Sequence, residues 1–131
     1  MHQSVAAVAV HSDTVLMARR RPGGAIGGCW EFPGGKVEGD ETHQQALKRE
    51  IREELGVGCS PGERLAQTSF RNGPQEYRLY AYRVRLHGDC FNLRDHVEVR
   101  WLHWSEAASL TLADSDRALL MLLLARFSAA I

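Results

Sequence analysis

The chain has few cysteines and no excess of charge of either sign. Its three cysteines (Cys29, Cys59 and Cys90) are odd in number, far apart, and include no Cys-x-x-Cys pair. This usage argues against a disulfide framework or a zinc site and favours a reducing compartment. The 16 basic and 16 acidic residues cancel to a formal net charge of zero. We therefore expect no polymeric nucleic acid as a partner.

Long hydrophobic runs are also missing. The longest apolar stretch, residues 118–125, is too short to cross a bilayer, so we expect no membrane partner. The N-terminus lacks a charged segment followed by an apolar core, which predicts that there is no signal peptide and that the protein is cytoplasmic. With 44% hydrophobic and 24% charged residues, the composition predicts a single globular domain over residues 1–131.

Apolar runs and alternating patterns predict a sheet. In residues 97–104, Val97, Val99 and Trp101 alternate with polar residues, as in a half-buried strand. The pair Asn72-Gly73 predicts a hairpin, in which Pro74 makes the turn longer than two residues. The predicted strands are residues 5–10, 15–18, 65–70, 77–86 and 97–104.

Two helices are predicted. Thr42 followed by Gln45 forms a capping-box signal, which predicts a helix through about Leu55 that ends at Gly56 or Gly58. Leu47, Ile51 and Leu55 give this helix an apolar stripe. A second, strongly apolar helix is predicted at about residues 115–127. Strands combined with two helices predict an α/β or α+β sandwich.

The first helix carries three glutamates on one face. Glu50, Glu53 and Glu54 have the spacing i, i+3, i+4. Two unit charges about 5.5 Å apart repel by roughly 3 kcal/mol at an effective dielectric constant of about 20. Such a face is either solvated and balanced by Arg49 and Arg52, or it holds a divalent cation. Ligands that are all oxygen suit Mg²⁺ or Mn²⁺.

The residues around these glutamates form a longer pattern. Gly35 is followed after five residues by Glu41, and after seven more by Arg49-Glu50-Ile51-x-Glu53-Glu54-x-Gly56-Val57. This pattern matches the Nudix box in full. The stretch Trp30-Glu31-Phe32-Pro33-Gly34 and the preceding arginines resemble the MutT-like branch of this family, which includes 8-oxo-dGTP diphosphatases and CTP pyrophosphohydrolases. The resemblance covers most of the chain and implies an α/β/α sandwich with a central mixed sheet.

The resemblance implies a metal site and a set of catalytic residues. The metal ligands would be Glu50, Glu53, Glu54 and the backbone carbonyl of Gly34, and the cofactor Mg²⁺ or Mn²⁺. Glu53 is the preferred general base, because a carboxylate next to a metal can position water and accept its proton. Arg49 would hold a carboxylate in place. The remaining predicted catalytic positions are Glu41, which braces the loop or tunes the site, and Asp95.

The substrate-binding positions lie mostly outside the box. The resemblance implies that Arg20 and Lys36 contact phosphates and that Phe32 packs against the base. Gln75 and Asp116 fall where the family recognises the base. An ionised aspartate only accepts hydrogen bonds, so Asp116 favours a base edge rich in donors, such as that of cytosine, or is protonated to recognise an oxoguanine. Asp116 could instead cap the last helix.

The function implied is a Mg²⁺-dependent hydrolase that converts a nucleoside triphosphate to the monophosphate and pyrophosphate. Its expected substrates are oxidised or modified nucleotides, either 8-oxo-dGTP or CTP and modified dCTP. Two alternatives stay open: another nucleoside diphosphate-X substrate such as ADP-ribose or an RNA 5′ end, and a non-catalytic nucleotide sensor. No spacing among the six histidines indicates a metal site, and nothing requires His96, beside Asp95, to lie at the site. Nothing in the sequence indicates an oligomeric state.

Overall fold

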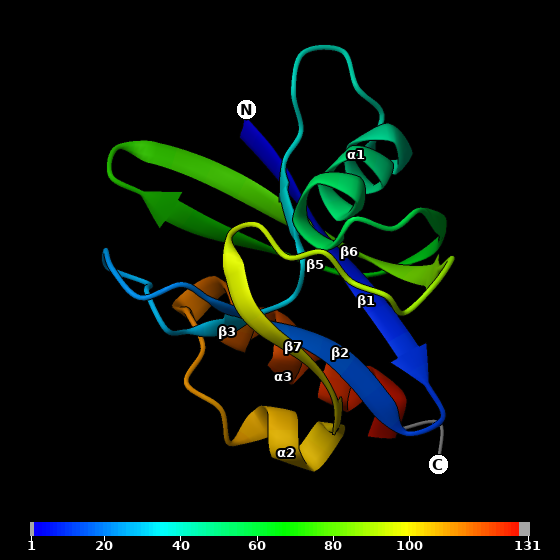
Figure 1. Ribbon diagram of the computed structural model, residues 1–131. Coiled ribbons are helices and arrows are strands. Elements are labelled where there is room, and N and C mark those ends of the chain that lie inside the picture. Colours follow the sequence, from blue (N-terminus) through cyan, green and yellow to red (C-terminus); the bar gives the residue numbers. More distant parts are fainter. Residues whose placement is uncertain (1, 129–131) are drawn as a thin grey trace.

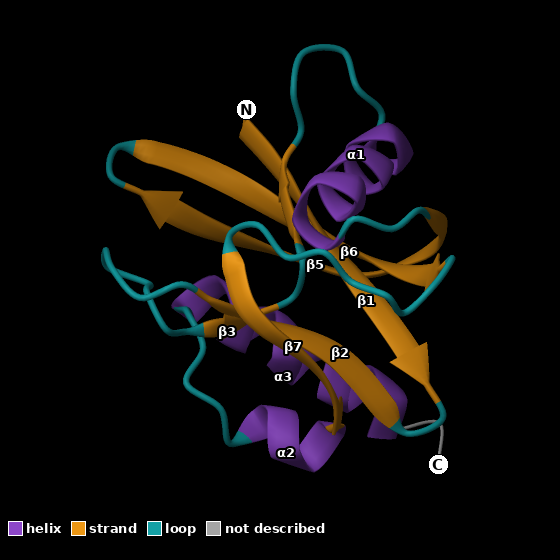
Figure 2. Ribbon diagram, in the orientation of Figure 1, coloured by secondary structure: helices purple, strands orange, loops and turns teal. Residues whose placement is uncertain are grey.

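The computed structural model describes residues 2–128 and forms a mixed α+β fold (Figures 1 and 2). All three cysteines are free. In the part of the chain that is described, no helix is long and apolar enough to span a membrane. The strands are β1 (His2–His11), β2 (Thr14–Arg20), β3 (Trp30–Glu31), β4 (Gly34–Lys36), β5 (Cys59–Asn72), β6 (Gln75–Leu86) and β7 (His96–His103); the helices are α1 (His43–Leu55), α2 (Trp104–Ala108) and α3 (Asp114–Ser128).

The strands form one mixed sheet in the order β3-β2-β1-β6-β5, with β4 also paired to β1 and β7 to β2. Strand β6 runs parallel to β1, and the other pairs are antiparallel. The last residues of β1 pair with β2 (Val10 with Val15), whereas its first half pairs with β4 (Ala6 with Gly34). Because β6 occupies the other edge of β1, β1 and β2 separate beyond these residues; β4 then pairs with β1, and β3 pairs with β2.

Both faces of β1 are buried. Val5 and Ala7 pack in a hydrophobic cluster with α1, while Ala6 and Val8 pack in a second cluster with α3. A strand covered on both sides is apolar at every position instead of every second one. This double coverage explains the nearly continuous apolar run that predicted the strand.

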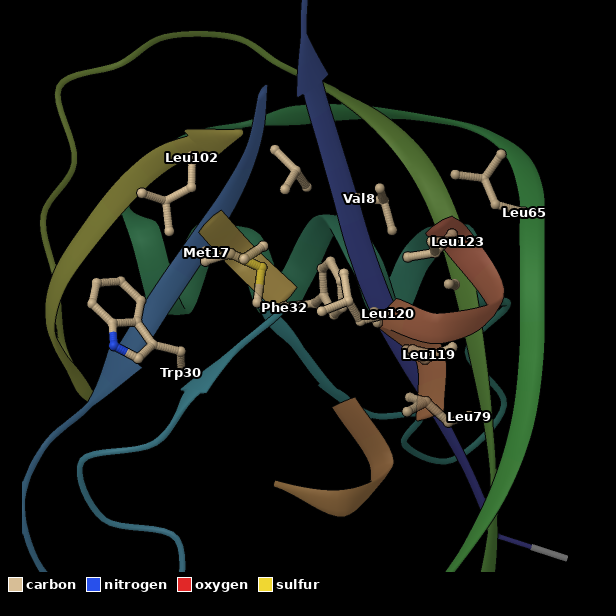
Figure 3. Packing of buried hydrophobic residues seen from close by; sticks show 14 residues of the cluster. Val8, Met17, Trp30, Phe32, Leu65, Leu79, Leu102, Leu119, Leu120 and Leu123 are labelled. Carbon is tan, nitrogen blue, oxygen red and sulfur yellow. The ribbon is translucent and has the colours of Figure 1, made fainter. Parts of the chain in front are cut away.

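The two long helices lie on opposite faces of the sheet. Each buried leucine contributes about 1.5–3 kcal/mol to stability. Figure 3 shows the leucines of α3 packed with Phe32 and Met17. The predicted α/β/α sandwich with a central mixed sheet is confirmed. The fully buried side chains that anchor the helices are Leu47, Ile51 and Leu55 of α1 and Leu119, Leu120 and Leu123 of α3.

Helix α1 begins and ends as the sequence predicts. The Thr42 hydroxyl accepts a hydrogen bond from the Gln45 N–H at 3.1 Å, and the Gln45 side chain accepts one from the Thr42 N–H at 2.9 Å. The helix ends at Gly56, whose φ of +72° suits a residue without a side chain. These two caps fix the length of the helix that carries the glutamates.

The predicted turn length of the β5–β6 hairpin is wrong. Asn72 pairs directly with Gln75, so Gly73 and Pro74 alone form the turn. Gly73 has a φ of +63°, which the first central position of a type II′ turn requires. The fixed negative φ of proline suits the second position, so Pro74 is compatible with the short turn.

Strand β7 is confirmed, although two of its three alternating apolar residues are exposed. Val97 and Trp101 are 44% and 40% exposed, whereas His96 and Leu102 are buried. Helix α1 packs mainly on β1, β4 and β5, and of the three alternating apolar residues of β7 only Val99 packs partly against the cluster beneath that helix. The short strands β3 and β4 and helix α2 were not predicted, because glycine-rich loops and five-residue helices leave little periodic signal.

Candidate active site

The glutamate face of α1 packs against the glycine pair of β4. Glu54 is 5% exposed, and its Oε1 accepts a hydrogen bond from the Gly34 N–H at 2.8 Å. A Cβ at Gly35 would lie 2.4 Å from Cδ of Glu50, and one at Gly34 would lie 2.0 Å from the carbonyl oxygen of Val5. Only glycine lets this strand fit between β1 and the helix.

Arg49 ties the glutamates of the box together. Its Nε and Nη2 donate to the two oxygens of Glu41 at 2.7 and 2.9 Å. Its Nη1 lies 2.8 Å from Glu50 Oε1 and 3.4 Å from Glu53 Oε2, and Nη2 also donates to the Lys36 carbonyl. These bonds hold the pKa of Glu41 down at about 2, chiefly through the Arg49 side chain. Glu41 therefore braces the loop and Arg49.

The carboxylates of Glu50 and Glu54 have too little positive charge around them to offset their burial. Burial raises the pKa of Glu54 to about 8, against the hydrogen bond from Gly34, and the charges of Glu31 and Glu50 raise it further. Burial likewise raises the pKa of Glu50, although Arg49 opposes this. One arginine thus offsets only part of the repulsion among these acids.

This donor set fits a hard divalent cation. Glu50, Glu53 and Glu54 offer only oxygen atoms on one helix face, and two of them are removed from water without full compensation. These three residues and the carbonyl of Gly34 are those that would hold the ion. The metal identity and these ligand assignments stay predictions.

A second acidic group, which sequence reasoning missed, adjoins the box. Glu31, Glu54 and His96 present ligand atoms that all lie within 4.8 Å of one another. Nε2 of His96 lies 2.9 Å from Glu31 Oε2 and 3.7 Å from Glu54 Oε2. Only the position of His96 next to Asp95 hinted at this, because these residues come from three distant segments.

Asp95 directly precedes β7 and the buried His96. Its side chain is exposed, and it does not line either of the two cavities that contain the predicted substrate-binding residues. Its backbone carbonyl accepts a hydrogen bond from the Arg21 N–H at 3.1 Å. A catalytic role for Asp95 stays a prediction without support from a contact.

A cleft lies beside the box and consists of two adjoining cavities of 210 and 460 Å³. Glu31, Phe70, Ser115 and Asp116 line both cavities, so they form the wall that the two share. Three further predicted positions, Arg20, Phe32 and Lys36, line the smaller one. The cleft thus gathers four of the five predicted substrate-binding residues.

Asp116 is buried in this cleft. It lies inside the first turn of α3, and its Oδ1 accepts a hydrogen bond from the Phe32 N–H at 3.1 Å. Burial, followed by the charge of Glu31, raises its pKa to about 7. Asp116 is the third residue of the helix and bonds to a distant backbone amide, which argues against the capping interpretation.

Gln75 does not reach the cleft. It is exposed at the first position of β6, paired with Asn72 beside the hairpin turn. The residues of this hairpin that line the larger cavity are Phe70, Arg71 and Asn72. The short turn places Gln75 past them, so its role in base recognition stays a prediction.

Comparison with known proteins agrees with this geometry. The NUDIX domain family matches residues 1–123. The chain belongs to the Nudix family. It is 36% identical over 120 residues to a CTP pyrophosphohydrolase of Escherichia coli, and this alignment covers 92% of this chain and 89% of that protein. It is 38% identical over 116 residues to a putative 8-oxo-dGTP diphosphatase 2 of Mycobacterium tuberculosis, covering 86% and 81% of the two chains.

The fold of this Nudix hydrolase has a matching solved structure. The crystal structure of a MutT protein from Methanosarcina mazei superposes with a TM-score of 0.83 at 25% identity, covering 98% of this chain and 94% of that one. The relatives named above are pyrophosphohydrolases and diphosphatases. The chain is therefore a hydrolase of the MutT-like kind.

Proposed function

We propose that this Nudix hydrolase is a Mg²⁺-dependent nucleoside triphosphate pyrophosphohydrolase that cleaves between the α- and β-phosphates and releases the monophosphate and pyrophosphate. The observation that carries the proposal is the position of the intact box beside a cleft lined by Arg20, Phe32 and Asp116. Mn²⁺ could replace Mg²⁺. The substrates proposed are 8-oxo-dGTP, or CTP and modified dCTP, and the biological role is removal of oxidised or modified nucleotides.

The residues of the site have separate roles in this reaction. Arg20 and Lys36 bind phosphate oxygens along the smaller cavity. Glu53, whose side chain is 44% exposed, orients a water molecule and accepts its proton, and Arg49 holds Glu53 in place. A divalent cation bound by the box supplies positive charge that screens the phosphate oxygens.

Two acids in the cleft, the partly buried Glu31 and the buried Asp116, support recognition of a base with an amino group. Glu31 and Asp116 both line the cleft, and carboxylates accept hydrogen bonds from exocyclic amines. With a pKa of about 7, Asp116 is available in both protonation states near neutral pH. The protonated form can also donate, which suits an oxoguanine edge. The named activities of the two relatives support the same two bases.

The test is a substrate panel. Purified protein with Mg²⁺ is incubated with 8-oxo-dGTP, dGTP, CTP, dCTP, modified dCTPs, ADP-ribose and a 5′-triphosphorylated RNA, and the products are separated by chromatography. We expect monophosphate and pyrophosphate in equal amounts from at least one triphosphate. Release of inorganic phosphate and a diphosphate, or turnover of ADP-ribose or RNA alone, would contradict the proposal. Nucleotide binding without turnover would favour the sensor alternative.

A further inference from the structure

His96 lies between the cleft and the box helix. It is the first residue of β7 and pairs with Arg20, where the β2–β7 ladder shifts its register. Such irregularities redirect side chains, and here the imidazole is fully buried. Its Nε2 lies 2.9 Å from Glu31 Oε2, within hydrogen-bond distance, and faces Glu54 Oε2 at 3.7 Å.

Each of these two glutamates is also held from another side. Glu31 Oε2 receives Nη1 of Arg20 at 3.2 Å, and Glu54 Oε1 receives the Gly34 N–H at 2.8 Å. Glu31 lines both cavities of the cleft, whereas Glu54 belongs to the metal-binding face. His96 thus faces one carboxylate that lines the cleft and one that belongs to the metal-binding face.

The chemistry of the ring points to a purpose for Nε2. Two carboxylates that face each other away from water repel, and an N–H donor between them offsets that repulsion. Nδ1 of His96 is buried and has no hydrogen-bond partner among the described residues. A buried polar atom left unpaired costs about 1–3 kcal/mol. An apolar side chain would fill the space without this cost, so packing alone does not account for a histidine here.

We propose that His96 is a positioning residue whose Nε2–H is hydrogen-bonded to Glu31 and also faces Glu54, so that it holds these two carboxylates next to each other and connects nucleotide binding in the cleft with metal binding by the box. Its kinetic consequence rests on the proposed function; its effect on metal affinity does not. His96 acts through the two glutamates and does not itself contact substrate.

Two nearly isosteric substitutions separate the two ring nitrogens. The amide nitrogen of glutamine can reach the position of Nε2, whereas that of asparagine reaches the position of Nδ1. We expect His96→Asn and His96→Ala to weaken Mn²⁺ binding to the nucleotide-free protein about 10- to 100-fold. His96→Gln should stay within about threefold of the unsubstituted protein. Electron paramagnetic resonance of free Mn²⁺ measures the affinity, and steady-state kinetics separate kcat from KM.

His43→Ala is the matched control. His43 is partly buried and bonds through both ring nitrogens, to Tyr82 and Gln3 on the sheet, and does not line the cleft. We expect this variant to lower Tm while leaving the Mn²⁺ affinity unchanged. Equal Mn²⁺ affinity in all His96 variants, or His96→Gln as weak as His96→Asn, would overturn the proposal.

The outcomes also separate this proposal from the proposed function. If no triphosphate is turned over by the unsubstituted protein but the Gln–Asn contrast in Mn²⁺ affinity is present, the proposed function fails and the role of His96 stands. If His96→Ala does not fold, the comparison of His96→Gln with His96→Asn carries the test.

Discussion

Glu53 differs from the other two box glutamates in its surroundings. Its side chain is 44% exposed, against 14% for Glu50 and 7% for Glu54. Arg49 Nη1 holds Glu53 at 3.4 Å, a longer contact than the 2.8 Å to Glu50. An exposed, loosely held carboxylate is more accessible to a water molecule than the less exposed Glu50 and the buried Glu54. This contrast favours Glu53 as the base.

Replacing Glu53 by glutamine tests that role. We expect kcat to fall about 10²- to 10⁴-fold, because an amide cannot accept a proton from water. Tm should change little, since the side chain is exposed. Glu63→Gln, which removes an exposed carboxylate that pairs with Arg83, is the matched control and should keep full activity. Full activity in the Glu53 variant would remove it from the mechanism.

Asp116→Asn tests the cost of burying an acid. The pKa of Asp116 rises from 3.8 to about 7 on folding, so the folded state prefers the protonated form. Stability from this group is fully present below pH 3.8 and is lost as pH rises towards 7. At about 1.4 kcal/mol per pKa unit, the loss is about 4 kcal/mol at most. We expect the Asp116→Asn variant to match the parent near pH 4 and to be more stable at pH 8.

Urea unfolding at pH 4 and pH 8 measures this difference. Asp114→Asn, which removes an exposed carboxylate from the same helical turn, is the control and should change stability by less than about 1 kcal/mol at either pH. An equal effect of Asp116→Asn at both pH values would show that the carboxyl does not carry this cost.

Among the secondary-structure elements, strand β4 shapes the site because its backbone lies directly against the glutamates of α1. Its glycine pair leaves the Glu50 carboxylate room directly above Gly35, and the caps at Thr42 and Gly56 set where that helix begins and ends. Strand β4 and α1 therefore act as one unit. A side chain added to the strand must displace either Glu50 or the strand itself.

Gly35→Ala is expected to lower kcat at least about tenfold and to destabilise the fold by about 1–3 kcal/mol, because its Cβ would overlap the Glu50 carboxylate. Gly88→Ala is the matched control, since its Cβ would meet Val57 at an ordinary 3.9 Å. Kinetics and thermal unfolding of both variants measure the effects. Unchanged activity in Gly35→Ala would mean that Glu50 can move without consequence.

At the scale of the whole molecule, the separation of β1 from β2 creates the site. It lets β4 pair with β1 within the sheet, next to the cleft that Asp116 of α3 lines. The chain thereby places carboxylates from α1, β3 and α3 close together, and Coulomb repulsion among them opposes folding. A cation that binds the folded form relieves part of this repulsion.

We therefore expect Mg²⁺ or Mn²⁺ to raise Tm, and EDTA to reverse the increase. At a concentration about 100 times the Kd, binding adds about 2.7 kcal/mol to the free energy of unfolding. The double variant Glu50→Gln with Glu54→Gln should lose this dependence. Thermal unfolding with and without each metal measures it, and a Tm that is insensitive to both ions would contradict the metal site.

The family resemblance, helix α1 with its caps, and the sandwich class could all be predicted from the amino-acid sequence. These features depend on local signals: fixed spacings within the box, capping residues at Thr42 and Gln45, and apolar periodicity in the strands. Local spacing also identified Glu50, Glu53 and Glu54, since residues on one helix face share that face wherever the helix packs.

The surroundings of those glutamates could not be predicted, because they depend on how distant segments pack in three dimensions. The roles of Glu31 and His96 depend on β3, α1 and β7 meeting, and no spacing along the chain encodes that contact. The burial that raises the pKa of Asp116 and Glu54 arises from packing between segments far apart in sequence. Asp95 is exposed because it lies just before the start of β7, and Gln75 is exposed because it follows a two-residue turn. A match to the residue spacing of a family does not show either of these local details.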